Sequence, residues 1–240
     1  HMNYVRNLII GFGKGVKTLA GALAKAGQKT VLVERSPAMY GGTCINVACI
    51  PTKSLEHSAR LSAAMGGTFE EKAARFRAAV SRKRELTAAL RQKNYSKAVA
   101  AGVEVIDGHA SFIGPRVVEV RLNNGTREEI QAERVFINTG SVPVFPAIEG
   151  LAASRFVYTS ETLMEREDLP ERLVIIGGGY IGLEFASYFA NFGSAVTIVQ
   201  SGSAFIPRED AEVAAAVAEN FKARGITVLR SAATLSVRDE

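Results

Sequence analysis

The chain has 240 residues and a net charge of +5, with 47% hydrophobic and 22% charged residues. These values are typical of a globular protein with one large domain or two modest ones. The modest positive charge requires no nucleic-acid partner and suits anionic dinucleotides. No stretch approaches the roughly 20 apolar residues of a membrane span, and the N-terminus lacks a basic-then-apolar signal peptide. We therefore expect a cytoplasmic protein that has neither a nucleic acid nor a membrane as partner.

A strand–helix–strand pattern is predicted at the start of the chain. A short apolar run at residues 7–10 stops at Gly11, which is typical of a buried parallel strand. Helical periodicity follows over residues 14–26, and residues 30–33 form the next predicted strand, which ends at Glu34. This is one complete βαβ unit.

The same pattern returns later in the chain. An apolar run at residues 173–176 precedes Gly177, a predicted helix continues to Gly193, and residues 195–199 form the next strand. Internal repetition of a βαβ unit predicts two bound dinucleotides, or one dinucleotide and a decayed copy of its site.

The residues between the two units predict further elements. Residues 72–97 read as a long helix with a solvated basic face. Residues 103–137 read as a β-meander with a turn at residues 123–125. The predicted fold is α/β, with two Rossmann-like dinucleotide-binding units and the meander as an insertion. We expect a first domain over residues 3–150 and a second over residues 151–240, because proline and glycine accumulate near the boundary.

The first glycine-rich loop has the composition of a phosphate-binding loop. Gly11 allows the tight turn, Gly13 lets the backbone approach a pyrophosphate, and the helix N-terminus supplies N–H donors. The third fingerprint position is normally small and here is Val16, beside Gly15. Glu34 is placed to accept hydrogen bonds from ribose hydroxyls.

The second loop, with Gly177, Gly179 and Gly182, is a complete fingerprint. A glycine-rich turn before a helix can serve packing alone. Two such loops in one chain, each between a predicted strand and a predicted helix, make a purely structural role a poor explanation.

The two cysteines, Cys44 and Cys49, are close in sequence. Two residues five apart on an ideal helix have Cα atoms roughly 8–9 Å apart, whereas a disulfide needs less than about 7 Å. The segment must therefore be bent or unwound at its start if the two sulfurs are to bond. A constrained short-loop disulfide is readily reduced, and a helix N-terminus favours a thiolate. A structural disulfide and a zinc site are the alternatives, but His57 and His109 lack ligand spacing and no metal site is expected.

Residues 41–53, Gly-Gly-Thr-Cys-Ile-Asn-Val-Ala-Cys-Ile-Pro-Thr-Lys, resemble the redox motif of the class I pyridine nucleotide–disulfide oxidoreductases. That family includes glutathione reductase, dihydrolipoyl dehydrogenase and mercuric reductase. The resemblance covers essentially the whole chain. Within the family the chain looks most like the bacterial reactive-chlorine-resistance flavoproteins, through residues 10–14, 38–46, 136–140 and 207–210. It implies FAD and NAD(P)H as cofactors.

The resemblance also implies roles for individual residues. Cys44 matches the cysteine that exchanges with substrate, and Cys49 the one that lies against the flavin. Lys53 matches a lysine that pairs with a glutamate, here Glu184, beside the flavin, and Tyr180 matches an aromatic residue over the nicotinamide pocket. The cofactor-binding positions implied by the motif and the two loops are Gly11, Gly13, Gly15, Glu34, Gly42, Thr43, Lys53, Thr139, Gly140, Gly177, Gly179, Tyr180, Gly182, Glu184 and Gln200.

The chain departs from the family pattern in a few places. Ala48 replaces a glycine, Val16 replaces the third glycine of the first loop, and Asn138 stands where most relatives have alanine. Family members are about twice as long and end in an interface domain, for which we find no counterpart. We therefore expect a chain ending at Glu240 to bind FAD weakly or not at all and to show no steady-state turnover. The full-length protein is expected to be a homodimer.

These observations favour an FAD-dependent NAD(P)H:disulfide oxidoreductase. Electrons would pass from NAD(P)H through FAD to Cys44–Cys49 and on to a small-molecule oxidant, in redox homeostasis or oxidative stress. One alternative is a metal-ion reductase that uses the same dithiol on copper or mercury. Another is a non-catalytic nucleotide-binding module with a structural disulfide. Neither an acid nor an arginine stands near Gln200, so we expect NADH use with less than about tenfold discrimination.

Overall fold

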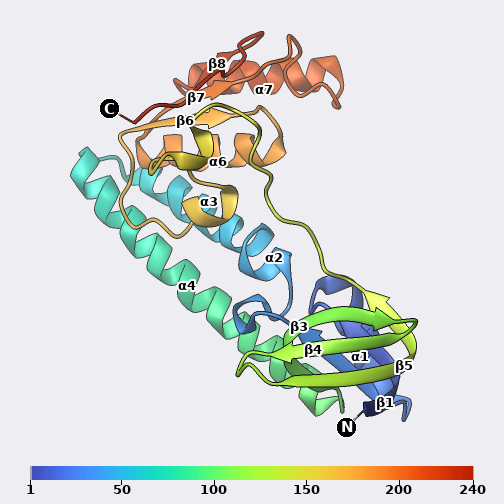
Figure 1. Ribbon diagram of the computed structural model, residues 1–240. Coiled ribbons are helices and arrows are strands. Elements are labelled where there is room, and N and C mark those ends of the chain that lie inside the picture. The colour runs from blue at the N-terminus through green and yellow to red at the C-terminus, as the bar shows by residue number, and fades with distance from the viewer. Residues whose placement is uncertain (1, 240) are drawn as a thin grey trace. The chain divides into compact units, whose positions relative to one another are not determined.

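The computed structural model describes residues 2–239, and its elements are labelled in Figure 1. The chain forms two compact units. The first comprises residues 1–51 and 84–142, and the second comprises residues 52–83 and 143–240. The boundary expected at residue 150 concerns cofactor-binding domains and stays a prediction.

The first unit begins with the expected βαβ arrangement, made by β1 (Met2–Ile10), α1 (Lys14–Lys25) and β2 (Thr30–Glu34). β1 pairs with β2 in parallel, and β2 is buried along its whole length. α1 buries Val16 and Ala20, which lie one turn apart on the same face. β1 begins earlier than expected because it also pairs with β5 along most of its length.

The predicted meander is present as β3 (Glu104–Gly114), β4 (Val117–Leu122) and β5 (Arg127–Ile137), in which β4 is antiparallel to both β3 and β5. Its turn closes where the Gly125 N–H donates to the Leu122 carbonyl at 2.9 Å. β3 pairs with β2 and β5 pairs with β1, so the five strands close into a barrel (Figure 1). The strands share one core of buried side chains: Val5, Leu8, Val31, Val33, Val118, Val120, Ile130 and Ala132.

The cysteine segment follows β2 as η1 (Pro37–Met39), α2 (Thr43–Asn46) and α3 (Cys49–Met65). α2 ends at Val47, whose φ of −136° and ψ of 9° are not helical. The helix is therefore interrupted between the two cysteines, which confirms the expected distortion. The long helix α4 (Phe69–Ala100) comes next; its residues 69–83 belong to the second unit and its residues 84–100 to the first.

The second unit contains the other predicted βαβ arrangement. Gly193, at φ +107°, ends α6, and its N–H donates to the Phe189 carbonyl at 3.1 Å. β6, β7 and β8 pair in parallel. Apolar residues of α3, α4, α6 and α7 pack with these strands into one core. The elements after the meander are η2 (Leu151–Ala153), α5 (Ser160–Leu163), β6 (Arg172–Ile176), α6 (Tyr180–Phe192), β7 (Ala195–Val199), α7 (Ala211–Ala223) and β8 (Thr227–Leu229).

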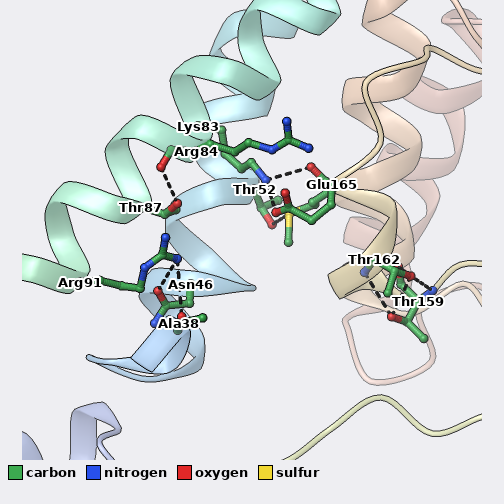
Figure 2. Close-up of polar contacts among 11 residues, drawn as sticks. Ala38, Asn46, Thr52, Lys83, Arg84, Thr87, Arg91, Thr159, Thr162 and Glu165 are labelled. Carbon is green, nitrogen blue, oxygen red and sulfur yellow. Dashed lines mark hydrogen bonds and ion pairs between the residues drawn. The ribbon is translucent and has the colours of Figure 1, made fainter. Parts of the chain in front are cut away.

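One basic residue of α4 contradicts the expected solvated face. The Lys83 side chain is only 1% exposed, donates to the Met164 carbonyl at 2.9 Å and pairs with Glu165 (Figure 2). It thus joins α4 to the chain just after α5, whose own N-terminus is capped by Thr159 and Thr162. The expectation was wrong here because a buried lysine is tolerated when its charge and hydrogen bonds are satisfied. Within residues 2–239, no helix is both long and apolar enough to cross a membrane.

Candidate active site

The two thiols lie together in the first unit. Cys44 is half-buried in α2, Cys49 is exposed as the first residue of α3, and both are free thiols. The hydrogen bond with Cys49, followed by burial, raises the pKa of the Cys44 thiol, while Lys14 and Lys17 act to lower it. Cys44 and Cys49 thus form a pair of reduced thiols, one on each side of the break between α2 and α3.

Asn46 fixes the loop that leads into Cys44. Its amide nitrogen donates to the carbonyls of Tyr40 at 3.0 Å and Gly42 at 2.9 Å. Its amide oxygen accepts from Arg91 at 3.3 Å. The side chain is buried, so these bonds satisfy groups that would otherwise be costly to bury. Asn46 was not predicted as a site residue, although its polar side chain between the apolar Ile45 and Val47 was the available signal.

The motif and the first glycine loop touch one another through Gly42. A Cβ atom on Gly42 would lie 2.5 Å from the Cα of Gly13, and Gly42 has a φ of +86°. Both facts exclude a larger residue at this position. A Cβ on Gly140 would lie 3.8 Å from the Thr43 hydroxyl, so the turn at Thr139 and Gly140 also adjoins the motif.

Asn138 covers the first loop and was missed as a site residue. A Cβ on Gly13 would lie 2.7 Å from the side-chain nitrogen of Asn138, and a Cβ on Gly15 would lie 3.0 Å from the side-chain oxygen of Asn138. Its carbonyl oxygen would lie 2.1 Å from a Cβ on Gly11. The close approach of the Asn138 backbone therefore requires glycine at position 11, and the Asn138 side chain leaves little room for a Cβ at Gly13 and Gly15. The signal was present in the sequence as the departure from alanine.

The N-terminus of α1 has the properties of an anion site. Its N-cap residue, Gly13, makes no side-chain capping bond, and the first turn carries no acidic residue. Apart from the Val16 N–H, which donates to the Gly13 carbonyl at 3.4 Å, the N–H groups of this turn are therefore placed to bind a ligand.

Glu34 is buried at the end of β2 and ties the first loop to that strand. Its carboxylate accepts from the Phe12 N–H at 2.9 Å and from the Ser36 N–H at 3.1 Å. Binding of ribose by Glu34 stays a prediction. Arg35, the next residue, lines a cavity of about 490 Å³ together with His109 and Arg121, among others.

The second loop repeats this arrangement with Gln200 in place of Glu34. The Gln200 side-chain oxygen accepts from the Gly178 N–H at 2.9 Å. A Cβ on Gly182 would lie 2.6 Å from the Gly177 carbonyl, so the helix–strand packing requires glycine there. No atom of the described residues would lie within 4 Å of a Cβ on Gly179, which leaves this loop open.

Tyr180 follows that open loop and lines a cavity of about 560 Å³ together with Gly177 and Gly179. The tyrosine is largely exposed, and its hydroxyl donates to Glu209 at 2.8 Å. The remaining walls are mostly apolar, as is usual for pockets that bind small molecules. They include Phe145, Phe156, Val157, Ile176, Ile181 and Phe185.

Lys53 and Glu184 form the expected ion pair between α3 and α6, within the second unit. Both side chains are largely exposed, at 63% and 43%. An exposed pair contributes only about 0–1 kcal/mol to stability. Both residues line a cavity of about 380 Å³. The contribution of this ion pair to stability is therefore too small to explain why the two charged residues lie together.

Two dinucleotide-type loops and a close pair of thiols are the features expected of a nucleotide-dependent thiol oxidoreductase. The chain belongs to the pyridine nucleotide-disulphide oxidoreductases, because the model of that family matches residues 5–240.

Individual relatives agree with this assignment. The chain is 45% identical over 232 residues to the probable pyridine nucleotide-disulfide oxidoreductase RclA of Escherichia coli, covering 96% of this chain and 50% of the relative. It is 39% identical to the mercuric reductase of Streptomyces lividans, covering 92% of this chain and 47% of the relative. The solved Cu(II) complex of the HOCl-induced flavoprotein disulfide reductase RclA from Escherichia coli matches with a TM-score of 0.90 and 43% identity, covering 100% of this chain and 52% of that one. The chain thus spans about half the length of the relatives it matches.

Proposed function

We propose that this chain carries the FAD loop, the NAD(P)H loop and the reactive dithiol of a flavoprotein disulfide reductase. The observation that carries the proposal is the contact between Gly42 of the cysteine motif and Gly13 of the first loop. It joins the thiol pair to a dinucleotide-binding turn within one compact unit. A nucleotide-binding module with a merely structural disulfide would have no need of this connection.

The residues of the first loop fit FAD. The uncapped N-terminus of α1 offers N–H donors to a pyrophosphate, and the Asn138 amide adds a side-chain donor beside it. Gly42, Thr43, Thr139 and Gly140 adjoin this loop and would hold the cofactor with it. Bound there, FAD would supply the chemistry of accepting a hydride from NAD(P)H and passing two electrons to a disulfide.

The dithiol completes a balanced two-electron cycle. NAD(P)H, one proton and the Cys44–Cys49 disulfide give NAD(P)⁺ and two thiols. The Cys44 thiolate then attacks a disulfide substrate, forming a mixed disulfide and releasing one substrate thiol. The Cys49 thiolate attacks the Cys44 sulfur, which re-forms the Cys44–Cys49 bond and releases the second thiol.

The second unit would hold the nicotinamide coenzyme. Gly177 and Gly179 form an open loop, and Tyr180 lines the adjoining apolar cavity. Gln200 is uncharged, and its side-chain oxygen already accepts a hydrogen bond from the loop backbone at Gly178. The family resemblance implies that Lys53 supplies positive charge to the flavin, and within the second unit Glu184 fixes its ammonium group.

The test measures thiols that appear on reduction. The FAD-loaded holoenzyme is oxidised in air, mixed with NADH without oxygen, and quenched with iodoacetamide. We expect labels on Cys44 and Cys49 after NADH and on neither cysteine when NADH is omitted. Equal labelling with and without NADH would contradict the proposal. A stable disulfide that NADH never opens would support a structural bridge instead.

A metal ion is the second candidate for the oxidant. It is favoured by the mercuric reductase among the relatives and by the solved Cu(II) complexes of RclA. The same dithiol would deliver its two electrons to the metal, which reduces one Hg²⁺ to Hg⁰ or two Cu²⁺ to two Cu⁺. NADH consumption measured with oxidised glutathione, lipoamide, Cu²⁺ and Hg²⁺ separates the two candidates.

A further inference from the structure

The last part of α4 places three side chains against the cysteine segment. Arg91, Asn94 and Tyr95 are three and four residues apart and so lie on one face of the helix. Arg91 donates to the Asn46 side chain at 3.3 Å and to the Ala38 carbonyl at 3.5 Å, as Figure 2 shows. The Tyr95 ring stacks on Tyr40, with ring centroids 5.0 Å apart.

Asn94 lies between these two contacts and touches the motif itself. A Cβ on Gly41 would lie 3.1 Å from the side-chain carbon Cγ of Asn94. Its amide nitrogen donates to the Leu90 carbonyl at 2.7 Å, and its amide oxygen accepts from the Lys17 ammonium at 2.8 Å. The two bonds use a donor and an acceptor that cannot be exchanged, so the amide has one orientation.

Lys17 is therefore a fixed cation of α1, held beside the loop that leads into Cys44. The charged or titrating groups that act on Cys44 are Cys49 from α3 and Lys14 and Lys17 from α1. Those that act on Lys17 are Cys44, Lys14 and Lys97 of α4. Partial burial lowers the pKa of Lys17, and the influence of Cys44 opposes that change. Lysine and thiol thus affect each other in the sense expected of a cation beside a thiolate.

We infer that Lys17, oriented by Asn94, acts with Lys14 to stabilise the thiolate of Cys44 and thereby increases the reactivity of this thiol towards oxidised substrates. The inference rests on the proposed function, which makes Cys44 the exchanging cysteine. Lys17 is a positioning residue in this role, because it acts on the sulfur through charge and forms no bond in the reaction. A flexible surface lysine would be too mobile and too well hydrated to have the same effect.

The test measures the alkylation of Cys44 by iodoacetamide over a series of pH values. A Cys49→Ser background leaves Cys44 as the remaining cysteine of the two. A nearby cation lowers a thiol pKa, so its loss moves the alkylation profile to higher pH. We expect Lys17→Gln, which keeps an amide to bond Asn94, to slow alkylation at neutral pH by about 3- to 10-fold. Lys17→Arg restores the charge and most of the rate.

Two further variants separate charge from structure. Asn94→Ala keeps the charge and releases the lysine, so it shifts the profile in the same direction by a smaller amount. Lys25→Gln, at the exposed end of the same helix, is the matched control and leaves the profile unchanged. A Lys17→Gln profile equal to that of Lys25→Gln overturns the inference. If Lys17→Gln fails to fold by circular dichroism, Asn94→Ala carries the test, and an unshifted profile overturns it.

The measurement needs neither FAD nor NADH. If the proposed function fails, NADH opens no disulfide while the lysine-dependent alkylation profile persists. If only this inference fails, NADH-dependent thiols still appear, and the pH profile of Cys44 alkylation is the same with and without Lys17.

Discussion

The two βαβ units of this chain use one hydrogen bond in the same place. In the first, the Phe12 N–H donates to Glu34 at the end of β2, and in the second the Gly178 N–H donates to Gln200 just after β7. In each unit the residue that follows the first loop glycine is tied to the end of the second strand. The units differ in the side chain at this position, because glutamate carries a carboxyl group and glutamine an uncharged amide.

The loops differ more in what surrounds them. The first is covered by Asn138 and Gly42, which come from distant parts of the chain, while the second is open at Gly179. Their third fingerprint positions also differ. Gly182 admits close helix–strand packing, whereas Val16 fills the equivalent place with a buried side chain. A shared fingerprint thus determines the turn and the start of the helix, and long-range contacts determine how accessible the loop is.

The contact of Gly42 with the first loop is expected to have the largest effect on stability, so its removal is the strongest test of the difference between the two loops. Gly42→Ala forces a Cβ to within 2.5 Å of the Gly13 backbone at a positive φ. We expect it to lower the free energy of unfolding by about 3 kcal/mol or more. Gly27→Ala is the control, because Gly27 also has a positive φ but no atom within 4 Å of its Cβ position. Its expected cost is about 1 kcal/mol. Equal urea midpoints for the two variants would show that the Gly42 contact is unimportant.

The next effect compares the two loops directly. Gly13→Ala brings a Cβ to 2.7 Å from the Asn138 amide and is expected to cost about 1–2 kcal/mol of stability. Gly179→Ala meets open space and should be nearly neutral. Removing the amide with Asn138→Ala should relieve the first variant and leave the second unchanged. A double-mutant cycle in urea measures the coupling energy between the two positions. Additive losses of stability for Gly13→Ala and Asn138→Ala would contradict the contact between Asn138 and the first loop.

The smallest effect concerns the charge difference between Glu34 and Gln200. With a neutral residue at the second position, we expect NADH to be favoured over NADPH by less than about tenfold, or roughly 1.4 kcal/mol. Gln200→Glu should raise that preference, because a carboxylate accepts from the 2′-hydroxyl and repels a 2′-phosphate. Dissociation constants of both coenzymes test this, with Gln131→Glu as a control in the other unit. A preference beyond a hundredfold in the unaltered protein contradicts it.

Local signals predicted much of this fold correctly. Both βαβ units, the turn at Gly125 and the interrupted helix between the cysteines depend on neighbouring residues, and each is present. The ion pair of Lys53 and Glu184 followed from the family resemblance and is also formed.

Long-range contacts could not be predicted in the same way. The cover of Asn138 on the first loop depends on how β5 returns beside β1. The sequence predicted one solvated basic face for residues 72–97, but residues 69–83 of α4 pack in one unit and residues 84–100 in the other. The face formed by Arg91, Asn94 and Tyr95 could therefore not be predicted from the sequence, and neither could the burial of Lys83.

The central claim is that Cys44 and Cys49 have different roles beside one flavin. It is tested most directly by the long-wavelength absorbance that a thiolate gives when it lies against an oxidised flavin, measured on the FAD-loaded holoenzyme. We expect Cys44→Ser to show this band, because its Cys49 thiolate has no partner with which to form a disulfide. We expect Cys49→Ser to lack it. A band retained in Cys49→Ser and lost in Cys44→Ser would reverse the assignment, and the absence of a band from both variants would contradict a thiolate at the flavin.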